Sequence, residues 1–325
     1  MEIIETVKFW AENSCFDAET RAEAKKLLDA ENQKKREECF GSLLEFGTGG
    51  LRGIMGVGTN RINRYTVQMA TEGVARIIEK KKNESGTTGV VIGYDSRHNS
   101  FEFAKVASEV LAAHGIPVYL FRKIAPTPLV SCELLRRQAI AGIIITASHN
   151  PPEYNGYKVY WENGGLIIPP EDSQIIEEVR NITRIDEIPT IPFEKAVQEK
   201  KMEWIDNEAD EYFLERVRSL SLGQRENNQK LGVIYTPLHG TGGRLVPELL
   251  QQQGFENVNV VEEQMVPDGD FSTVASPNPE DYKAFTMAME KASGNDELIL
   301  ANDPDADRLG AMVRDSDNQW HWLTG

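Results

Sequence analysis

The stretch Gly142-Ile-Ile-Ile-Thr-Ala-Ser-His-Asn-Pro151 decides the fold class of this chain. Its apolar, largely β-branched run is typical of a strand buried in a parallel sheet. Asn150, Pro151 and Pro152 cannot continue a strand, so the chain must turn there. The run therefore brings Ser148 to the rim of a sheet, where a rigidly held hydroxyl suits nucleophilic or phosphoryl chemistry. A turn serine is also often simply solvated, so other residues must support this interpretation.

Apolar runs alternate with helical stretches on both sides of this strand. The expected helices span residues 64–82, 100–114 and 129–137, and the expected strands span residues 88–94, 116–121 and 139–146. This alternation is typical of a layered α/β domain with a mainly parallel sheet. A second alternating run, between residues 208 and 301, predicts a second domain of the same kind.

The predicted fold class is α/β, with two layered αβα domains on mainly parallel, mixed sheets. We place domain I at residues 41–205 and domain II at residues 206–325. Residues 1–40 are rich in Glu, Lys, Ala and Leu, and they predict a helical segment ahead of the first sheet. Residues 181–200 are expected to form a connector, and residues 267–279 a loop over the cleft.

An acidic cluster, Asn302-Asp-Pro-Asp-Ala-Asp-Arg308, follows another predicted strand. Asp303, Asp305 and Asp307 either line one face of an extended segment or converge in a tight loop. Both geometries crowd like charges, and a divalent cation is the usual remedy. Carboxylate oxygens suit Mg²⁺, Ca²⁺ or Mn²⁺. A solvated acidic loop is the alternative, but the preceding strand and Arg308 favour a metal site.

A third feature is the glycine-rich stretch Gly47-Thr-Gly-Gly-Leu-Arg-Gly-Ile-Met-Gly56. Glycines at this density permit close backbone approach and positive φ, and successive N–H groups can form an anion nest. Arg52 supplies a planar fork suited to phosphate. The spacing is not the dinucleotide-binding fingerprint, and a flexible turn is the alternative.

Together these motifs resemble those of the α-D-phosphohexomutase superfamily, which includes phosphoglucomutases and phosphomannomutases. The matching pieces, in the family's order, are Gly49-Gly-Leu-Arg-Gly53, Gly93-Tyr-Asp-Ser-Arg97, Pro126-Thr-Pro128, Thr146-Ala-Ser-His-Asn-Pro151, Tyr154-Asn-Gly-Tyr-Lys158, Tyr235-Thr-Pro-Leu-His-Gly240 and Asp303-Pro-Asp-Ala-Asp-Arg308. The flanking residues look most like the phosphoglucomutase-2/phosphopentomutase-like branch. Pro304 departs from the glycine of many relatives, and proline fits there if φ is already about −65°.

The resemblance implies a phosphosugar mutase that moves a phosphoryl group between the 1- and 6-positions of a hexose phosphate. Ser148 would carry the phosphoryl group, with glucose 1,6-bisphosphate or an analogous bisphosphate as intermediate and activator. Mg²⁺ would be held by Ser148 and the three aspartates of the acidic cluster. Lys158 would be the general acid or base, with a pKa that must fall for base work. Arg52 and Arg308 would add fixed positive charge.

Three further residues have two interpretations each. His149, beside the nucleophile, either orients the phosphate and shares in proton transfer, or is a loop histidine bonded to backbone. His239, between a strand and a glycine-rich tip, either lines the cleft and binds phosphate or caps the following helix. Arg97 either contacts substrate at the cleft edge or forms a strand-end salt bridge.

Charge and composition limit the class of partner. The formal net charge of −16 argues against nucleic acid or an anionic membrane. No segment reaches the about 20 apolar residues of a membrane helix, and the N-terminus lacks the basic start of a secretion signal. The three cysteines form no Cys-x-x-Cys pair and indicate reduced thiols. We therefore expect a soluble, cytoplasmic enzyme that acts on a sugar phosphate.

Members of the family that this chain resembles continue into two further domains, which carry a sugar-discriminating loop and a phosphate-binding loop. We therefore expect the chain to be the N-terminal portion of a longer enzyme, whose missing C-terminal domains are needed for full turnover. The preferred sugar is left open between glucose, mannose and pentose phosphates. A phosphopentomutase or a sugar-bisphosphate synthase is the alternative within the family. A metal-dependent phosphatase and a non-catalytic sugar-phosphate binder are alternatives outside it, although mere binding needs no nucleophile.

Overall fold

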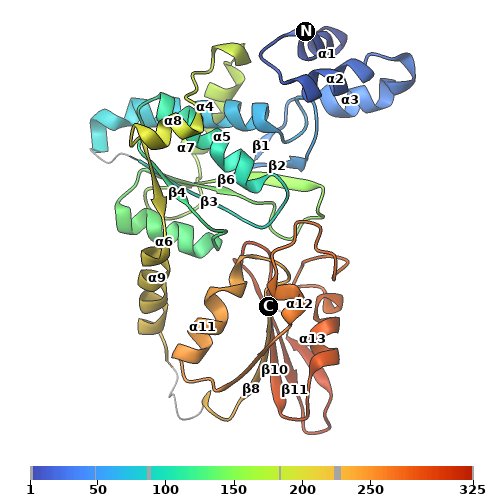
Figure 1. Cartoon of the computed structure of the whole chain (residues 1–325), viewed down its shortest axis with the longest axis vertical. Helices are drawn as coiled ribbons and strands as arrows, with labels where there is room; N and C mark the ends of the chain where they lie inside the picture. Colours follow the sequence, from blue (N-terminus) through green and yellow to red (C-terminus); the bar gives the residue numbers. More distant parts are fainter. Residues whose placement is uncertain (1–2, 48, 86–88, 183, 223–227, 324–325) are drawn as a thin grey trace.

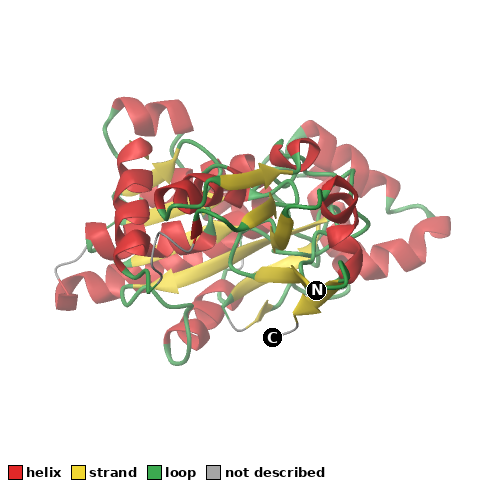
Figure 2. Ribbon diagram, turned by 90° about the horizontal axis from the view of Figure 1, so that it is seen from below, coloured by secondary structure: helices red, strands yellow, loops and turns green. Residues whose placement is uncertain are grey.

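The computed structural model describes residues 3–47, 49–85, 89–182, 184–222 and 228–323. Figure 1 shows a cluster of N-terminal helices (blue) beside domain I, with domain II (orange to red) below. Seen from below in Figure 2, strands run through the interior and helices surround them. Within the described residues, no helix is both long enough and apolar enough to cross a membrane. The predicted α/β class, with two sheets after a helical segment, is confirmed.

Domain I is built on a seven-stranded sheet, counted over the described residues. Its strands, in spatial order, are β1 (Phe46–Gly47), β2 (Gly50–Ile54), β6 (Tyr154–Trp161), β5 (Ala141–Ile145), β3 (Val90–Tyr94), β4 (Val118–Phe121) and β7 (Met202–Ile205). The pairs from β5 through β7 are parallel, and the pairs from β1 through β5 are antiparallel. The parallel half places the carboxyl ends of β3, β4 and β5 along one edge, which is where loops of α/β folds carry ligands.

Helices cover both faces of this sheet. One face packs against α4 (Arg64–Ser85), α5 (Ser100–Ala113), α7 (Glu171–Arg180) and α8 (Phe193–Gln198), and the other against α6 (Thr127–Arg137) and α9 (Asn207–Ser219). Successive residues of β5 alternate between the layers, since Ile143 and Ile145 join the first core and Ile144 joins the second. This two-sided burial explains the uninterrupted apolar run before Ser148.

Two parts of domain I differ from the sequence interpretation. The glycine-rich stretch is a strand over Gly50–Ile54 and not an anion nest, because β2 pairs along β6. Close approach does require glycine there: Gly50 has φ 144°, and a Cβ on it would lie 1.9 Å from the Tyr157 carbonyl oxygen. Residues 181–200, expected to be a connector, cross within domain I and lead through α8 to β7.

Domain II is built on a five-stranded sheet, again counted over the described residues. The strands, in spatial order, are β12 (Trp320–Leu323), β11 (Leu309–Arg314), β10 (Asp296–Asn302), β8 (Gly232–Thr236) and β9 (Asn257–Val260). β11 and β12 form an antiparallel hairpin at the C-terminal side of this domain. The remaining elements are η3 (Thr241–Gly243), α11 (Leu245–Gln252), α12 (Glu262–Met265), η4 (Tyr282–Phe285) and α13 (Thr286–Lys291). Residues 282–291 thus form a 3-10 turn followed by a short helix.

The N-terminal helices α1 (Ile3–Glu12), α2 (Ala18–Lys26) and α3 (Gln33–Phe40) are joined in part through η1 (Ala30–Asn32). They pack through an aromatic cluster in which Trp10 stacks on Phe16, with ring centroids 4.5 Å apart. Tyr65 of α4 joins this cluster and donates its hydroxyl to Asp17 at 2.9 Å. The helical segment is therefore fixed to domain I through α4.

Candidate active site

Ser148 lies in the turn that ends β5, with a left-handed φ of 52° and only 1% of its surface exposed. Its amide donates to Thr146 Oγ1 at 2.8 Å, and the Thr146 hydroxyl donates to Asp95 Oδ2 at 2.6 Å. Left-handed backbone is costly for a residue with a side chain, so the surrounding contacts must hold it. These hydrogen bonds fix the serine on the rim, as the strand pattern predicted.

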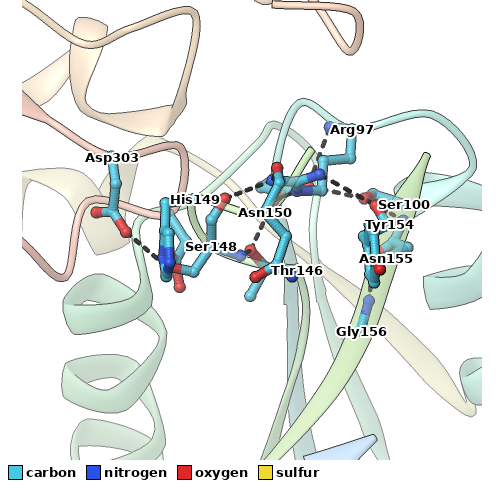
Figure 3. A network of polar contacts seen from close by, with 12 residues as sticks. Arg97, Ser100, Thr146, Ser148, His149, Asn150, Tyr154, Asn155, Gly156 and Asp303 are labelled. Carbon is cyan, nitrogen blue, oxygen red and sulfur yellow. Dashed lines mark hydrogen bonds and ion pairs between the residues drawn. The ribbon is translucent and has the colours of Figure 1, made fainter. Parts of the chain in front are cut away.

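Arg97 holds the rest of the serine turn (Figure 3). Its guanidinium donates to four backbone carbonyl oxygens at 2.5 to 3.0 Å, those of Ser148, Asn150, Pro151 and Tyr154. The side chain is buried, and its Nε lies 3.4 Å from Asp95 Oδ2. Arg97 therefore positions the serine turn from behind. Direct contact with substrate, one of the two predicted roles, stays a prediction.

Asp303, Asp305 and Asp307 converge in the turn after β10, so the tight-loop geometry is the observed one. One carboxylate oxygen from each lies within 4.8 Å of the others. Ala306, with φ 53°, and its amide hydrogen bond to the Asp303 carbonyl close the turn. Ser148 Oγ donates to Asp303 Oδ2 at 2.6 Å (Figure 3). Ser148 and the acidic cluster, from different domains, therefore meet at one site.

The acidic turn has the chemistry of a hard-cation site. Burial, reinforced by the neighbouring charges of Asp305 and Asp307, raises the pKa of Asp303 to about 8. Asp305 Oδ1 is buried and has no hydrogen-bond partner among the described residues. A crowded carboxylate set with a buried, unpaired oxygen fits Mg²⁺, which prefers oxygen ligands. The three aspartates, with Ser148 beside them, could hold such an ion.

Lys158 reaches the same turn from β6. Its Nζ lies 2.7 Å from Asp305 Oδ2 and 3.1 Å from Asp307 Oδ2. Burial alone would lower the pKa of Lys158, but these two carboxylates outweigh it and raise the pKa above the ordinary lysine value. The fall in pKa expected for base work is therefore not found, and Lys158 keeps its proton in this arrangement. Its role as general acid or base stays a prediction.

His149 and two arginines surround Ser148. His149 Nδ1 lies 3.2 Å from Ser148 Oγ, and burial, with help from Arg308 and Arg52, lowers its pKa. Arg52, on β2, donates to Asn150 Oδ1 at 3.2 Å, and Arg308 Nε lies 3.9 Å from Asp303 Oδ2. The two arginines therefore place positive charge beside the serine in an otherwise acidic chain.

His239 is buried in domain II, and its contacts there are internal. Its Nδ1 lies 2.9 Å from the Val266 carbonyl oxygen and its Nε2 lies 2.8 Å from Thr273 Oγ1. Because both ring nitrogens have partners, His239 anchors the segment after α12. Neither of the two predicted roles, phosphate binding and helix capping, corresponds to these contacts, and phosphate binding stays a prediction.

The sequence interpretation missed three supporting residues. Thr127, at the start of α6, donates its hydroxyl to Asp305 Oδ2 at 2.9 Å and its amide to the Asp305 carbonyl at 2.8 Å. Asp95 and Thr146 hold the serine turn through the hydrogen bonds described above. The motif Pro126-Thr-Pro128 contained the signal for Thr127, since a polar residue between prolines at a helix start is well placed to bond outside its own helix.

Models of two protein domains match this chain. The model described as Phosphoglucomutase/phosphomannomutase, alpha/beta/alpha domain I, matches residues 43–186, and that of alpha/beta/alpha domain II matches residues 210–316. The chain belongs to the α-D-phosphohexomutase superfamily. Both matched regions carry one half of the site, since Ser148 lies in the first and the acidic turn in the second.

Curated relatives in this superfamily include phosphoglucomutases of two staphylococci. The Staphylococcus aureus (strain USA300) protein is 38% identical over 313 residues, which cover 93% of this chain and 53% of the relative. The Staphylococcus haemolyticus protein is 36% identical over 300 residues, covering 92% of this chain and 54% of the relative. This phosphohexomutase chain therefore spans about half the length of those relatives.

A solved structure also shares the phosphohexomutase fold. The phosphoglucomutase/phosphomannomutase family protein of Burkholderia thailandensis aligns with a TM-score of 0.65 at 22% identity, covering 85% of this chain and 55% of that one. At this identity the likeness concerns the fold alone. The fold and the two matched domains agree with the resemblance drawn from the motifs.

Proposed function

We propose that this chain carries the phosphoryl-transfer site of a phosphosugar mutase, with Ser148 as the group that accepts and returns the phosphoryl group. The observation that carries the proposal is the 2.6 Å hydrogen bond from Ser148 Oγ to Asp303 Oδ2. It places a nucleophile against a crowded carboxylate set, which is the arrangement that metal-assisted phosphoryl transfer requires. When Mg²⁺ is bound by the aspartates, it would offset negative charge on the phosphoryl oxygens.

Side chains of this chain can donate and accept every proton that the proposed transfer requires. When a sugar bisphosphate phosphorylates Ser148, the Oγ–P bond forms as the bond from phosphorus to a sugar oxygen breaks. The Lys158 ammonium supplies a proton to the departing sugar oxygen, and the raised pKa of Lys158 suits this acid role. The serine proton leaves to His149 Nδ1, which lies 3.2 Å from the hydroxyl oxygen. Arg52 and Arg308 add positive charge near the same atoms.

The return step reverses these events at the other position of the sugar, so the phosphoryl group moves between positions 1 and 6 of a hexose phosphate. Glucose 1,6-bisphosphate is the proposed intermediate, and the name phosphoglucomutase of the staphylococcal relatives favours glucose as the sugar. A pentose phosphate is the alternative within the family. Initial rates of phosphoryl uptake from glucose 1,6-bisphosphate and ribose 1,5-bisphosphate, compared side by side, decide between the two.

The test of the nucleophile is intact-mass spectrometry after incubation with glucose 1,6-bisphosphate and Mg²⁺. The wild-type chain should gain the mass of one phosphoryl group, and Ser148→Ala should gain none. Ser131→Ala, a serine of α6 outside the site, is the matched control and should gain it as wild type does. Added phosphate on Ser148→Ala would refute the assignment. Rapid loss of the added phosphoryl group from the wild-type chain to water, without transfer back to a sugar, would indicate a phosphatase instead.

A further inference from the structure

Residues 267–274 of domain II form a compact turn, which we call the Phe271 turn. Asp268 organises it: one carboxylate oxygen accepts from the Asp270 amide at 2.9 Å and the other from the Ser272 amide at 3.0 Å. Phe271 has a left-handed φ of 50° and is buried, with 1% of its surface exposed. A buried aromatic side chain on a strained backbone indicates that the turn is held in place by contacts outside itself.

The Phe271 turn is anchored on domain II through Thr273. His239 Nδ1 lies 2.9 Å from the Val266 carbonyl oxygen, and its Nε2 lies 2.8 Å from the Thr273 hydroxyl oxygen. Gln264 Nε2 in turn donates to Thr273 Oγ1 at 2.9 Å. This hydrogen-bond network gives His239 a definite role, since it fixes one side of the turn to the end of β8.

The other side of the turn packs on domain I. The Arg97 guanidinium carbon lies 4.9 Å from the centroid of the Phe271 ring, within cation–π range. His98 Nε2 lies 2.7 Å from Asp270 Oδ1. A Cβ on Gly269 would lie 2.8 Å from the His98 amide nitrogen, so the two backbones are in close contact. The Phe271 turn therefore contacts Arg97, the arginine that donates to the carbonyl oxygens of the serine turn.

We propose that Phe271 is a positioning residue for Ser148 and acts through Arg97. The aromatic ring covers the face of a guanidinium whose Nη1 and Nη2 groups donate to four carbonyl oxygens of residues 148–154. Without the ring, the guanidinium loses a contact that holds its plane in place, so its bonds to those carbonyl oxygens weaken and the left-handed serine turn loses support. Domain II thus fixes Ser148 from two directions, through the acidic turn and through Phe271. The catalytic consequence rests on the proposed function, but the structural statement does not.

The structural test is hydrogen exchange measured by mass spectrometry on peptides covering residues 147–156. Phe271→Leu keeps an apolar side chain but removes the ring, and it should accelerate exchange in these peptides by roughly tenfold. Phe285→Leu is the matched control, because Phe285 is a fully buried phenylalanine in the separate core of domain II. Unchanged exchange in Phe271→Leu, or equal acceleration in Phe285→Leu, would overturn the proposal. If Phe271→Leu does not fold by circular dichroism, Phe271→Met takes its place with the same readout.

The catalytic test is the single-turnover rate of Ser148 phosphorylation by glucose 1,6-bisphosphate. Phe271→Leu should lower the maximal rate about tenfold and leave the half-saturating concentration unchanged, because the ring contacts Arg97 behind the serine turn. Phe271→Tyr, which retains an aromatic face, should recover most of the rate. A normal rate in Phe271→Leu would overturn the positioning role. Absence of phosphorylation in wild type would refute the proposed function instead, and the exchange experiment would still decide the role of Phe271.

Discussion

Lys158 Nζ, from the middle of a domain I strand, lies 2.7 Å from Asp305 Oδ2, in a turn of domain II. Asp305 is fully buried and Lys158 is largely buried, so each charge depends on the other. The lysine thus does two things at once: it neutralises part of the acidic turn, and it joins the two domains at the site.

Lys158→Met should destabilise the protein. Removing one partner of a buried ion pair leaves the other charge uncompensated, which costs about 3–5 kcal/mol. The measurement is thermal or urea unfolding in the presence of EDTA. Lys105→Met is the control, because Lys105 pairs with the exposed Glu102 and should change stability by about 0.5 kcal/mol or less. Equal stability of Lys158→Met and wild type would mean that the pair is not needed to hold the acidic turn.

Magnesium should stabilise the folded chain, and Asp305→Asn should weaken that effect. An ion that binds only the folded state adds about 2.7 kcal/mol at a free concentration 100 times its Kd. The readout is the melting temperature as a function of Mg²⁺ concentration. Asp317→Asn removes the same charge from an exposed turn and should respond to Mg²⁺ as wild type does. If Asp305→Asn kept the full response, the acidic turn would not be the binding site.

His114, which lies outside the site, should make the free energy of unfolding depend on pH. Its Nε2 lies 2.7 Å from Glu72 Oε2 and its Nδ1 lies 2.9 Å from Glu79 Oε1, while Arg76 also pairs with Glu72. The hydrogen bond to Glu72 raises the pKa of His114 above its ordinary 6.5. Protonated histidine therefore stabilises the fold fully below pH 6.5, and the stabilisation disappears as pH rises through the raised value.

The corresponding variant is His114→Gln, followed by thermal unfolding from pH 5.5 to pH 9. The melting temperature should differ from wild type most at the acid end, and the difference should shrink toward pH 9. His321→Gln is the control, because that histidine pairs with Asp315 on the surface of domain II. A difference that stays constant over the whole range would show that His114 does not titrate with folding.

Gly50→Ala should disrupt the antiparallel edge of the domain I sheet. The new Cβ would overlap the Tyr157 carbonyl oxygen, and φ of 144° is strained for alanine. We expect a loss of roughly 2–5 kcal/mol from strain and overlap. Gly47→Ala is the control, because Gly47 lies in the adjacent strand. Its new Cβ would lie 3.9 Å from the nearest atom, the Gly50 carbonyl oxygen, so this variant should change stability little. Because Gly50 pairs with Lys158 in the sheet register, Gly50→Ala should also impair Ser148 phosphorylation.

Residues with clear local patterns were predicted well. The apolar run of β5 and the turn residues after it placed Ser148 on the rim of a sheet, because burial on both faces and the loss of strand geometry at proline are local effects. The glycine-rich stretch was predicted poorly. Glycine disfavours strands on its own, and only the close approach of β6 turns Gly50–Ile54 into one.

The sequence by itself determined which groups the site contains: a serine after a buried strand, three alternating aspartates after another, and a lysine ten residues from the serine. Only the tertiary structure decided which of these groups are in contact and how their charges shift one another's pKa. The contact between Ser148 and Asp303 joins residues 155 positions apart, and the pKa of Lys158 rises only because two carboxylates from the other domain reach it. Arg97 and Phe271 are likewise distant in sequence and adjacent in space. Periodicity and turn chemistry act over a few residues, whereas desolvation and Coulomb interaction depend on distances that only the packed fold sets.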